Sequence, residues 1–177
     1  MENGDWAHAL LAFLRGNQVW VAPIVFVLAF AESLALIALL VPATFILWGV
    51  GAMIGASGIS FWPVWLAAAV GAGLGDWLSY WLGYHYHDRI ARMWPLTKYP
   101  DLLPKGRVFF EKWGVPGVFI GRFFGPLRAA VPLVAGACRM DWLPFQLANW
   151  SSAFVWAAVT LAPGAVGADW LRHYLNW

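Results

Sequence analysis

The stretch GVPGVFIGRFFGPLRAAVPLVAGACRM, residues 114–140, places Arg122 and Arg128 inside an apolar segment that prolines interrupt. An arginine at the centre of a bilayer costs about 3 kcal/mol on insertion scales, so such residues usually face a protein interior or a wet cavity and have partners. Proline removes a backbone donor and kinks or ends a helix, which predicts broken helical structure rather than one plain span. The two arginines therefore mark a predicted site inside a membrane segment.

Two acidic residues are equally out of place in the first half of the chain. Residues 33–75 contain no Asp, Glu, Lys or Arg, and Glu32 and Asp76 lie at the two ends of this charge-free run. Charged side chains within membrane segments usually pair with one another. The sequence thus predicts that two buried acids face two buried bases.

The composition is that of an integral membrane protein. Of the 177 residues, 62% are hydrophobic and 11% are charged, whereas a soluble domain has about 25% charged residues. The fourteen tryptophans suit membrane interfaces, and Trp77 and Trp156, which lie in the middle of their segments, are interpreted as packing residues. The net charge of +2 does not argue for nucleic acid as a partner. A single membrane domain over residues 1–177 fits this length, since each spanning helix needs roughly 20 apolar residues.

The chain divides into two halves around a polar segment. Residues 85–113 contain six of the 11 Lys and Arg residues, which predicts a cytoplasmic loop by the positive-inside rule. Residues 19–84 form the first half and residues 114–177 the second. For residues 1–18, an apolar helical face predicts an interfacial helix, and a frayed start to the first span is the alternative.

Both halves follow the same order, a broken apolar segment and then a long one. Glu32 precedes Pro42 by ten residues, and Arg122 precedes Pro132 by ten. Interrupted segments at corresponding positions indicate an inverted-repeat transporter, with a chance match as the alternative. The predicted fold class is an all-α polytopic membrane protein, an inverted repeat of two re-entrant helical hairpins packed with transmembrane helices.

The spacing of the arginines suits a shared anion site. Six residues on an unbroken helix would separate Arg122 and Arg128 by about 120°, but Gly125 and Pro126 allow a bend that brings them together. Guanidinium groups match phosphate or carboxylate oxygens in two-point contacts, so a phosphate head group fits. The alternative is that the arginines only pair with the two acids and hold the halves together.

The acids and their neighbours have further predicted roles. Apolar surroundings favour the protonated form of a carboxyl group, which makes Glu32 a candidate proton carrier. Asp76 and Tyr80 lie four residues apart on one helical face, which predicts that Tyr80 satisfies Asp76. Gly71 and Gly75 form a small-xxx-small pair, which predicts close helix packing.

Enzyme and metal chemistry have no support in the sequence. His85, His87 and Asp88 lie at a membrane edge without a further Cys or His at ligand spacing, so no metal site is predicted. The chain has no G-x-S-x-G, H-E-x-x-H or Walker glycine motif. We therefore expect neither a cofactor nor an enzymatic activity.

Two segments, GRFFGPLRAAVPLVAGACRM at residues 121–140 and GDWLSYWLG at residues 75–83, resemble the DedA family of bacterial inner-membrane proteins. The domain of that family is shared with the eukaryotic VTT-domain lipid scramblases. The resemblance implies that the substrate-binding set is Glu32, Asp76, Arg122 and Arg128. It also implies a supporting set, which consists of Tyr80, Pro42, Gly125, Pro126, Pro132 and Gly136.

The same resemblance implies a function. Members are linked to moving undecaprenyl phosphate or phospholipids between leaflets, and others to proton-dependent envelope and osmotic homeostasis. Where many members carry a second acid this chain has Thr44, and where many have Arg it has Tyr84, which weakens the case for proton coupling.

We therefore expect a lipid flippase or scramblase of the bacterial inner membrane. Its expected partners are the phosphate head groups of membrane lipids, with protons and a further copy of the chain compatible with the sequence. One rival hypothesis is a proton-coupled transporter of small ions or solutes. The other is a structural membrane protein in which the four charges form a buried lock.

Overall fold

A computed structural model describes residues 18–34, 43–57, 59–87, 102–124 and 127–175. Every regular element in these ranges is an α-helix, as the composition and apolar segments predict. The helices are α2 (Gln18–Ser33), α3 (Ala43–Ser57), α4 (Phe61–His85), α6 (Leu102–Gly121), α7 (Leu127–Ala137) and α8 (Trp142–Leu175). The all-α part of the predicted fold class is thus confirmed.

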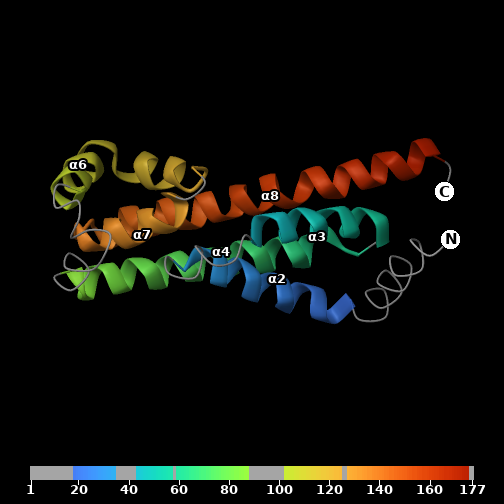
Figure 1. Ribbon diagram of the computed structural model, residues 1–177, viewed down its shortest axis with the longest axis horizontal. Helices are drawn as coiled ribbons and strands as arrows, with labels where there is room; N and C mark the ends of the chain where they lie inside the picture. The colour runs from blue at the N-terminus through green and yellow to red at the C-terminus, as the bar shows by residue number, and fades with distance from the viewer. Residues whose placement is uncertain (1–17, 35–42, 58, 88–101, 125–126, 176–177) are drawn as a thin grey trace.

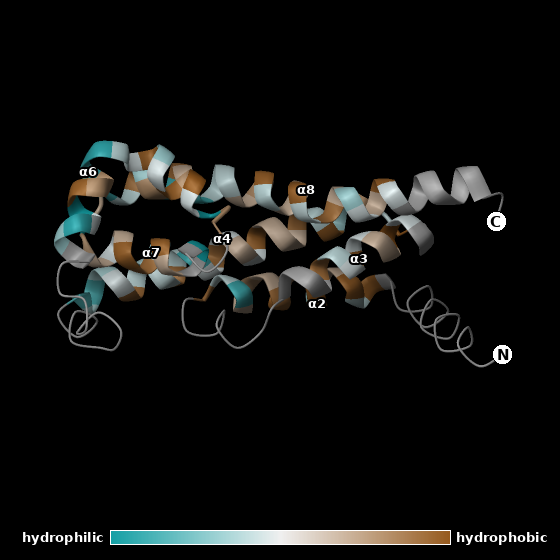
Figure 2. Ribbon diagram, turned by 45° about the horizontal axis from the view of Figure 1, so that its top comes forward, coloured by the Kyte–Doolittle hydropathy of each residue, from teal (hydrophilic) through white to brown (hydrophobic). Residues whose placement is uncertain are grey.

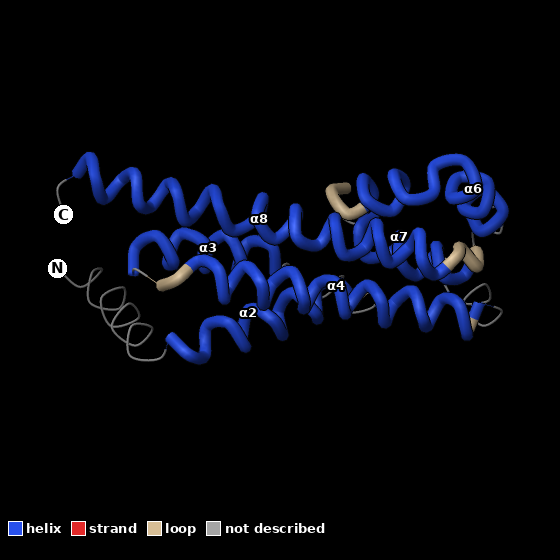
Figure 3. The backbone as a smooth tube through the Cα atoms, turned by 180° about the vertical axis from the view of Figure 1, so that it is seen from behind, coloured by secondary structure: helices blue, strands red, loops and turns tan. Residues whose placement is uncertain are grey.

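Two long helices and two helical hairpins make up the described structure. Helices α4 and α8 run in opposite directions along the long axis of the molecule (Figure 1). The pair α2 and α3 lies toward one end and the pair α6 and α7 toward the other. The described helix ends of each pair, the end of α2 in the first and the end of α6 and start of α7 in the second, lie near the middle and are called the tips below (Figures 1 and 3). The polar residues on the two tips are therefore brought together.

The arms of each hairpin contact different long helices. In the first half, α2 packs against α4 and α3 packs against α8. In the second half, α6 packs against α8 and α7 packs against α4. Each hairpin therefore joins its own long helix to that of the other half.

Apolar side chains dominate both the interior and the surface. Hydrophilic positions gather on α6 and at the adjacent end of α4, while α2 and α3 are mostly apolar (Figure 2). Val19, Trp62 and Val166 are each more than 60% exposed, as lipid-facing residues are. Among the described residues, one helical segment, Trp142–Gly167, is long and apolar enough to cross a bilayer on length and composition alone.

Two apolar clusters lie on either side of a polar layer. One cluster includes Ala72 of α4 and Ala153 of α8, and the other includes Tyr80 of α4 and Ala148 of α8. Four buried polar residues lie between these positions, Asp76 and Ser79 on α4 and Asn149 and Ser152 on α8. The buried face of each long helix is therefore polar near its middle and apolar on both sides.

Helices α4 and α7 touch through their backbones at two glycines. A Cβ added at Gly83 would collide with the carbonyl of Leu133, and one added at Gly136 would collide with the carbonyl of Tyr80. A Cβ at Gly71 would likewise collide with the carbonyl of Phe26 in α2. Small residues are therefore required at these crossings, in agreement with the packing interpretation of the glycine pair in α4.

Gly136→Leu is expected to lower the free energy of unfolding by about 3 kcal/mol, because the larger side chain forces α7 away from α4. The measurement is reversible unfolding in mixed micelles. Gly49→Leu is the matched control, since a Cβ at exposed Gly49 meets nothing within 4 Å. Equal stability of the two variants would contradict the prediction.

The hairpin of the second half differs from the prediction at one proline. Helix α7 runs without interruption through Pro132, which the sequence predicted to break the segment. A helix loses one hydrogen bond at an internal proline, here the bond to the carbonyl of Arg128, and the packing of α7 along α4 maintains it. A real break occurs at Gly114 in α6, where φ is 42°, a backbone conformation that glycine adopts readily.

Candidate functional site

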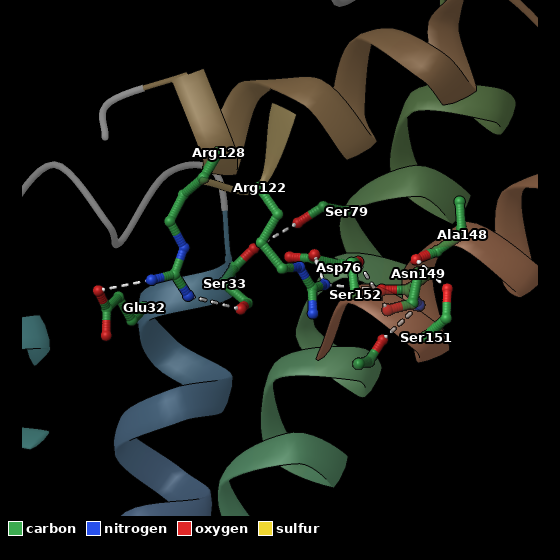
Figure 4. A network of polar contacts seen from close by, with 11 residues as sticks. Glu32, Ser33, Asp76, Ser79, Arg122, Arg128, Ala148, Asn149, Ser151 and Ser152 are labelled. Carbon is green, nitrogen blue, oxygen red and sulfur yellow. Dashed lines mark hydrogen bonds and ion pairs between the residues drawn. The ribbon is translucent and has the colours of Figure 1, made fainter. Parts of the chain in front are cut away.

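Arg122 lies just after α6 and reaches into the space between the two long helices. Its Nη2 donates to Oδ2 of Asp76, in the middle of α4, and forms an ion pair with it. The same nitrogen donates to Oδ1 of Asn149 in α8, at 2.8 Å. Asn149 in turn donates its Nδ2 to the carbonyl of Gly73 in α4, at 2.9 Å. One guanidinium thus joins both long helices to the tip of the second hairpin (Figure 4).

Arg128, in the first turn of α7, extends toward the other hairpin. Its Nη1 donates to Oε1 of Glu32 at 2.9 Å, and its Nη2 donates to Oγ of Ser33 at 3.4 Å. The face of Trp156 in α8 lies against the guanidinium, with 4.2 Å from Cζ to the ring centroid. Ser33 also accepts a hydrogen bond from Ser79 of α4 at its carbonyl, at 3.2 Å. The tips of the two hairpins are therefore joined by an ion pair.

All four charged side chains are buried. Glu32, Asp76, Arg122 and Arg128 are between 4% and 9% exposed. Two carboxylates and two guanidinium groups give the network no formal net charge. The attraction within each pair offsets much of the free energy needed to remove these groups from water. The predicted pairing of two buried acids with two buried bases is thus present, as Arg122 with Asp76 and Arg128 with Glu32.

One predicted contact is wrong. Tyr80 does not satisfy Asp76, because its hydroxyl donates to the carbonyl of Met140 at 2.6 Å. Its ring stacks on Phe145 of α8, with 4.0 Å between ring centroids. Tyr80 therefore fastens α4 to the turn between α7 and α8, and Asp76 is satisfied by Arg122 instead.

Tyr80→Phe is accordingly expected to lower the free energy of unfolding by about 1 kcal/mol, the usual net worth of one hydrogen bond. The buried ion pair at Asp76 should be unaffected, because the two groups do not bond. Unfolding in mixed micelles measures the loss, with exposed Tyr84→Phe as the control. A loss as large as that of Asp76→Ala would show instead that Tyr80 and Asp76 act together.

Sequence reasoning missed the uncharged members of the network. Asn149 and Trp156 lie in a run without Asp, Glu, Lys or Arg, and the interpretation of Trp156 as a packing residue missed its contact with Arg128. An amide in a largely apolar span was the available signal for Asn149, and Gln146 in the same span carries the same signal. Three predicted supporting residues, Pro42, Gly125 and Pro126, lie outside the described residues.

Each histidine at the end of α4 lies close to a carbonyl of the preceding turn, and Nε2 of His87 also lies 3.2 Å from Nη2 of Arg139. Nδ1 of His85 lies 3.0 Å from the carbonyl of Trp81, and Nδ1 of His87 lies 3.2 Å from that of Tyr84. Across the described ranges, no three His, Cys, Asp or Glu side chains are grouped as metal ligands would be. Asp88, the third residue of the cluster considered in the sequence, lies beyond those ranges.

Comparison with known proteins identifies the family. The VTT domain model matches residues 41–166, which include Asp76 and both arginines of the network. The chain belongs to the VTT-domain family, the DedA family of the sequence resemblance. Glu32 precedes the segment that matches the VTT domain.

Relatives of this VTT-domain chain are membrane proteins. Inner membrane protein YabI of Escherichia coli is 36% identical over 86% of this chain, and the matched part is 60% of YabI. Uncharacterized membrane protein BU139 of Buchnera aphidicola is 32% identical over 95% of this chain and 68% of its own length. Uncharacterized membrane protein Rv2637 of Mycobacterium tuberculosis is 33% identical over 63% of this chain and 54% of its own length. No solved structure matches the chain.

These findings place the protein in the inner membrane, as the DedA resemblance implied. The chain spans about 60% of the length of YabI, so the activity of the longer relatives is a separate matter.

Proposed function

We propose that this protein is a lipid translocase that moves a phosphate-headed lipid, such as undecaprenyl phosphate or a phospholipid, between membrane leaflets. The observation that carries the proposal is the buried network in which Arg122 and Arg128 meet two acids near the middle of the molecule. Buried ionisable residues in membrane proteins usually line a path for a substrate or ion. The DedA resemblance supports the choice of a lipid as substrate.

The proposal includes a polytopic arrangement with two re-entrant hairpins related as an inverted repeat. Helices α2, α3 and α7 have 16, 15 and 11 residues; at 1.5 Å per residue each is shorter than a hydrocarbon core of roughly 30 Å. Both hairpins point their tips toward the middle from opposite ends (Figure 1). The contacts of α2 and α3 with the long helices have their counterparts in those of α6 and α7, which supports the repeat.

In the proposed mechanism, the lipid phosphate exchanges with the carboxylates of Glu32 and Asp76 as partner of the arginines. Phosphate oxygens accept two-point hydrogen bonds from guanidinium, as carboxylate oxygens do. The head group then crosses along the polar layer while its hydrocarbon tails stay in lipid.

Leaflet exchange in vesicles tests this function. Labelled undecaprenyl phosphate or phospholipid is followed in vesicles containing the wild type, Arg122→Ala/Arg128→Ala, or Arg107→Ala as an exposed control. We expect rapid exchange with the wild type and the control, and background exchange with the double variant. Exchange by a folded double variant at the wild-type rate would overturn the proposal.

A second candidate function is proton-coupled transport of a small ion or solute. Two carboxylates in the buried network, Glu32 and Asp76, favour it because each could exchange its arginine for a proton. In vesicles with an imposed pH gradient, a solute flux that requires Glu32, without any lipid exchange, would support this function over the first.

A further inference from the structure

Helix α8 gives each arginine of the network one uncharged partner. Oδ1 of Asn149 accepts from Arg122 at 2.8 Å, and the ring of Trp156 lies 4.2 Å from Cζ of Arg128. The acid partners come instead from the first half of the chain, on α4 and α2. Each guanidinium is therefore held from two sides, by a carboxylate on one and by α8 on the other.

The two α8 residues form a fixed support. They are seven residues apart, close to two helical turns, so they lie on the same face about 10 Å apart along the axis. Both are buried. The hydrogen bond from Nδ2 of Asn149 to the carbonyl of Gly73, at 2.9 Å, orients the amide so that its oxygen faces Arg122. Asn149 and Trp156 are thus preorganised.

Uncharged partners differ from carboxylates in how they respond to an anion. A phosphate competes directly with Asp76 and Glu32 for positive charge, whereas an amide oxygen or an aromatic face holds a guanidinium without a net negative charge and so repels a nearby anion far less. Arg122 also keeps one nitrogen available, because its buried Nη1 has no hydrogen-bond partner among the described residues. A phosphate oxygen is a suitable acceptor for that nitrogen.

We propose that Asn149 and Trp156 are positioning residues, which keep Arg122 and Arg128 aligned for a lipid phosphate when their acidic partners are released. The inference rests on the proposed lipid translocase and assigns to α8 a role that the acids cannot fill. Loss of either residue should weaken head-group binding more than it slows the movement of bound lipid.

The test for Trp156 measures leaflet exchange over a range of undecaprenyl phosphate content in the vesicles, which separates the half-saturating lipid fraction from the maximal rate. Trp156→Leu is expected to raise the half-saturating fraction about tenfold, with a maximal rate within about twofold of wild type. Trp156→Phe retains an aromatic face and should restore most of the difference. Trp65→Leu is the matched control, because Trp65 also joins α4 to α8, through a 3.1 Å hydrogen bond to the carbonyl of Phe154.

A shape-preserving series makes the Trp156 test independent of folding. Fluorinated tryptophans introduced at position 156 withdraw electron density from the ring with little change in size. The half-saturating fraction should rise with each added fluorine if the ring holds the cation. A constant value throughout the series would overturn the role of Trp156.

The test for Asn149 uses a neighbouring amide as control. Asn149→Leu should raise the half-saturating fraction about tenfold, because a hydrogen bond to a charged group is lost. Gln146→Leu removes a buried amide one turn earlier, whose oxygen has no hydrogen-bond partner among the described residues, and should leave that fraction unchanged. If Asn149→Leu, like Gln146→Leu, lowers the unfolding temperature but leaves the half-saturating fraction unchanged, the role of Asn149 is structural and the inference fails.

The outcomes also distinguish failure of this inference from failure of the proposed lipid translocase function. If Arg122→Ala/Arg128→Ala abolishes exchange while the α8 variants keep a wild-type half-saturating fraction, only the positioning role is wrong. If the wild type shows no exchange of any lipid, the translocase itself is wrong.

Discussion

Arg128→Ala is expected to slow lipid exchange about a hundredfold, because truncation of a buried, hydrogen-bonded charge costs about 2–5 kcal/mol or more. Arg128 joins the two hairpin tips through Glu32, so its loss removes both a head-group ligand and that link. Leaflet exchange of labelled undecaprenyl phosphate measures the effect. Arg128→Lys keeps the charge but loses the forked donors, and about a tenth of the activity should remain.

This experiment must distinguish two effects of Arg128→Ala, the loss of stability when Glu32 loses its ion pair and the loss of a ligand for the lipid phosphate. Arg128→Ala leaves Glu32 buried beside Ser33 without its guanidinium, which itself lowers stability. Arg128→Ala/Glu32→Gln removes that charge and should regain stability but not exchange. Recovery of exchange in this double variant would mean that Arg128 serves only to neutralise Glu32, as the structural lock hypothesis holds.

The second large effect concerns stability. Asp76→Ala is expected to lower the free energy of unfolding by about 3–5 kcal/mol, because it leaves the guanidinium of Arg122 buried with Asn149 as its one remaining hydrogen-bond partner among the described residues. Reversible unfolding in mixed micelles measures the loss. Glu111→Ala, at an exposed acid in α6, is the control and should change stability by less than about 0.5 kcal/mol.

Removing both members of this ion pair should cost less than removing one. Arg122→Met/Asp76→Leu replaces the pair by apolar side chains of similar size, and we expect most of the lost stability to return. Such a variant should fold and yet fail to exchange lipid. If Asp76→Ala alone were as stable as wild type, the pair would not be buried as described.

The charged half of the site could be predicted from the sequence because charge is rare in this chain. Four ionisable residues in apolar segments have few alternatives to pairing with one another. The particular pairing, Arg122 with Asp76 and Arg128 with Glu32, depends on how the hairpins cross, which no local pattern specifies.

Other features depended on tertiary contacts that sequence spacing does not reveal. The four-residue spacing of Asp76 and Tyr80 suggested a local contact, but a carbonyl 60 residues away accepts the Tyr80 hydroxyl. Pro132 suggested a break, but packing along α4 maintains α7 through it. Asn149 and Trp156 gave little signal, because one amide and one indole are ordinary in a long apolar helix.

One helix of each hairpin packs on the long helix of the other half, and this exchange determines whether the chain can be divided into two fragments that fold. Because α3 rests on α8 and α7 rests on α4, neither half contains all the partners of its own core. A fragment that ends at residue 87 would expose the apolar side of α3, and one that begins at residue 102 would leave α7 without its support. Two separately translated halves should therefore fold only together, by exchanging arms as domain-swapped subunits do.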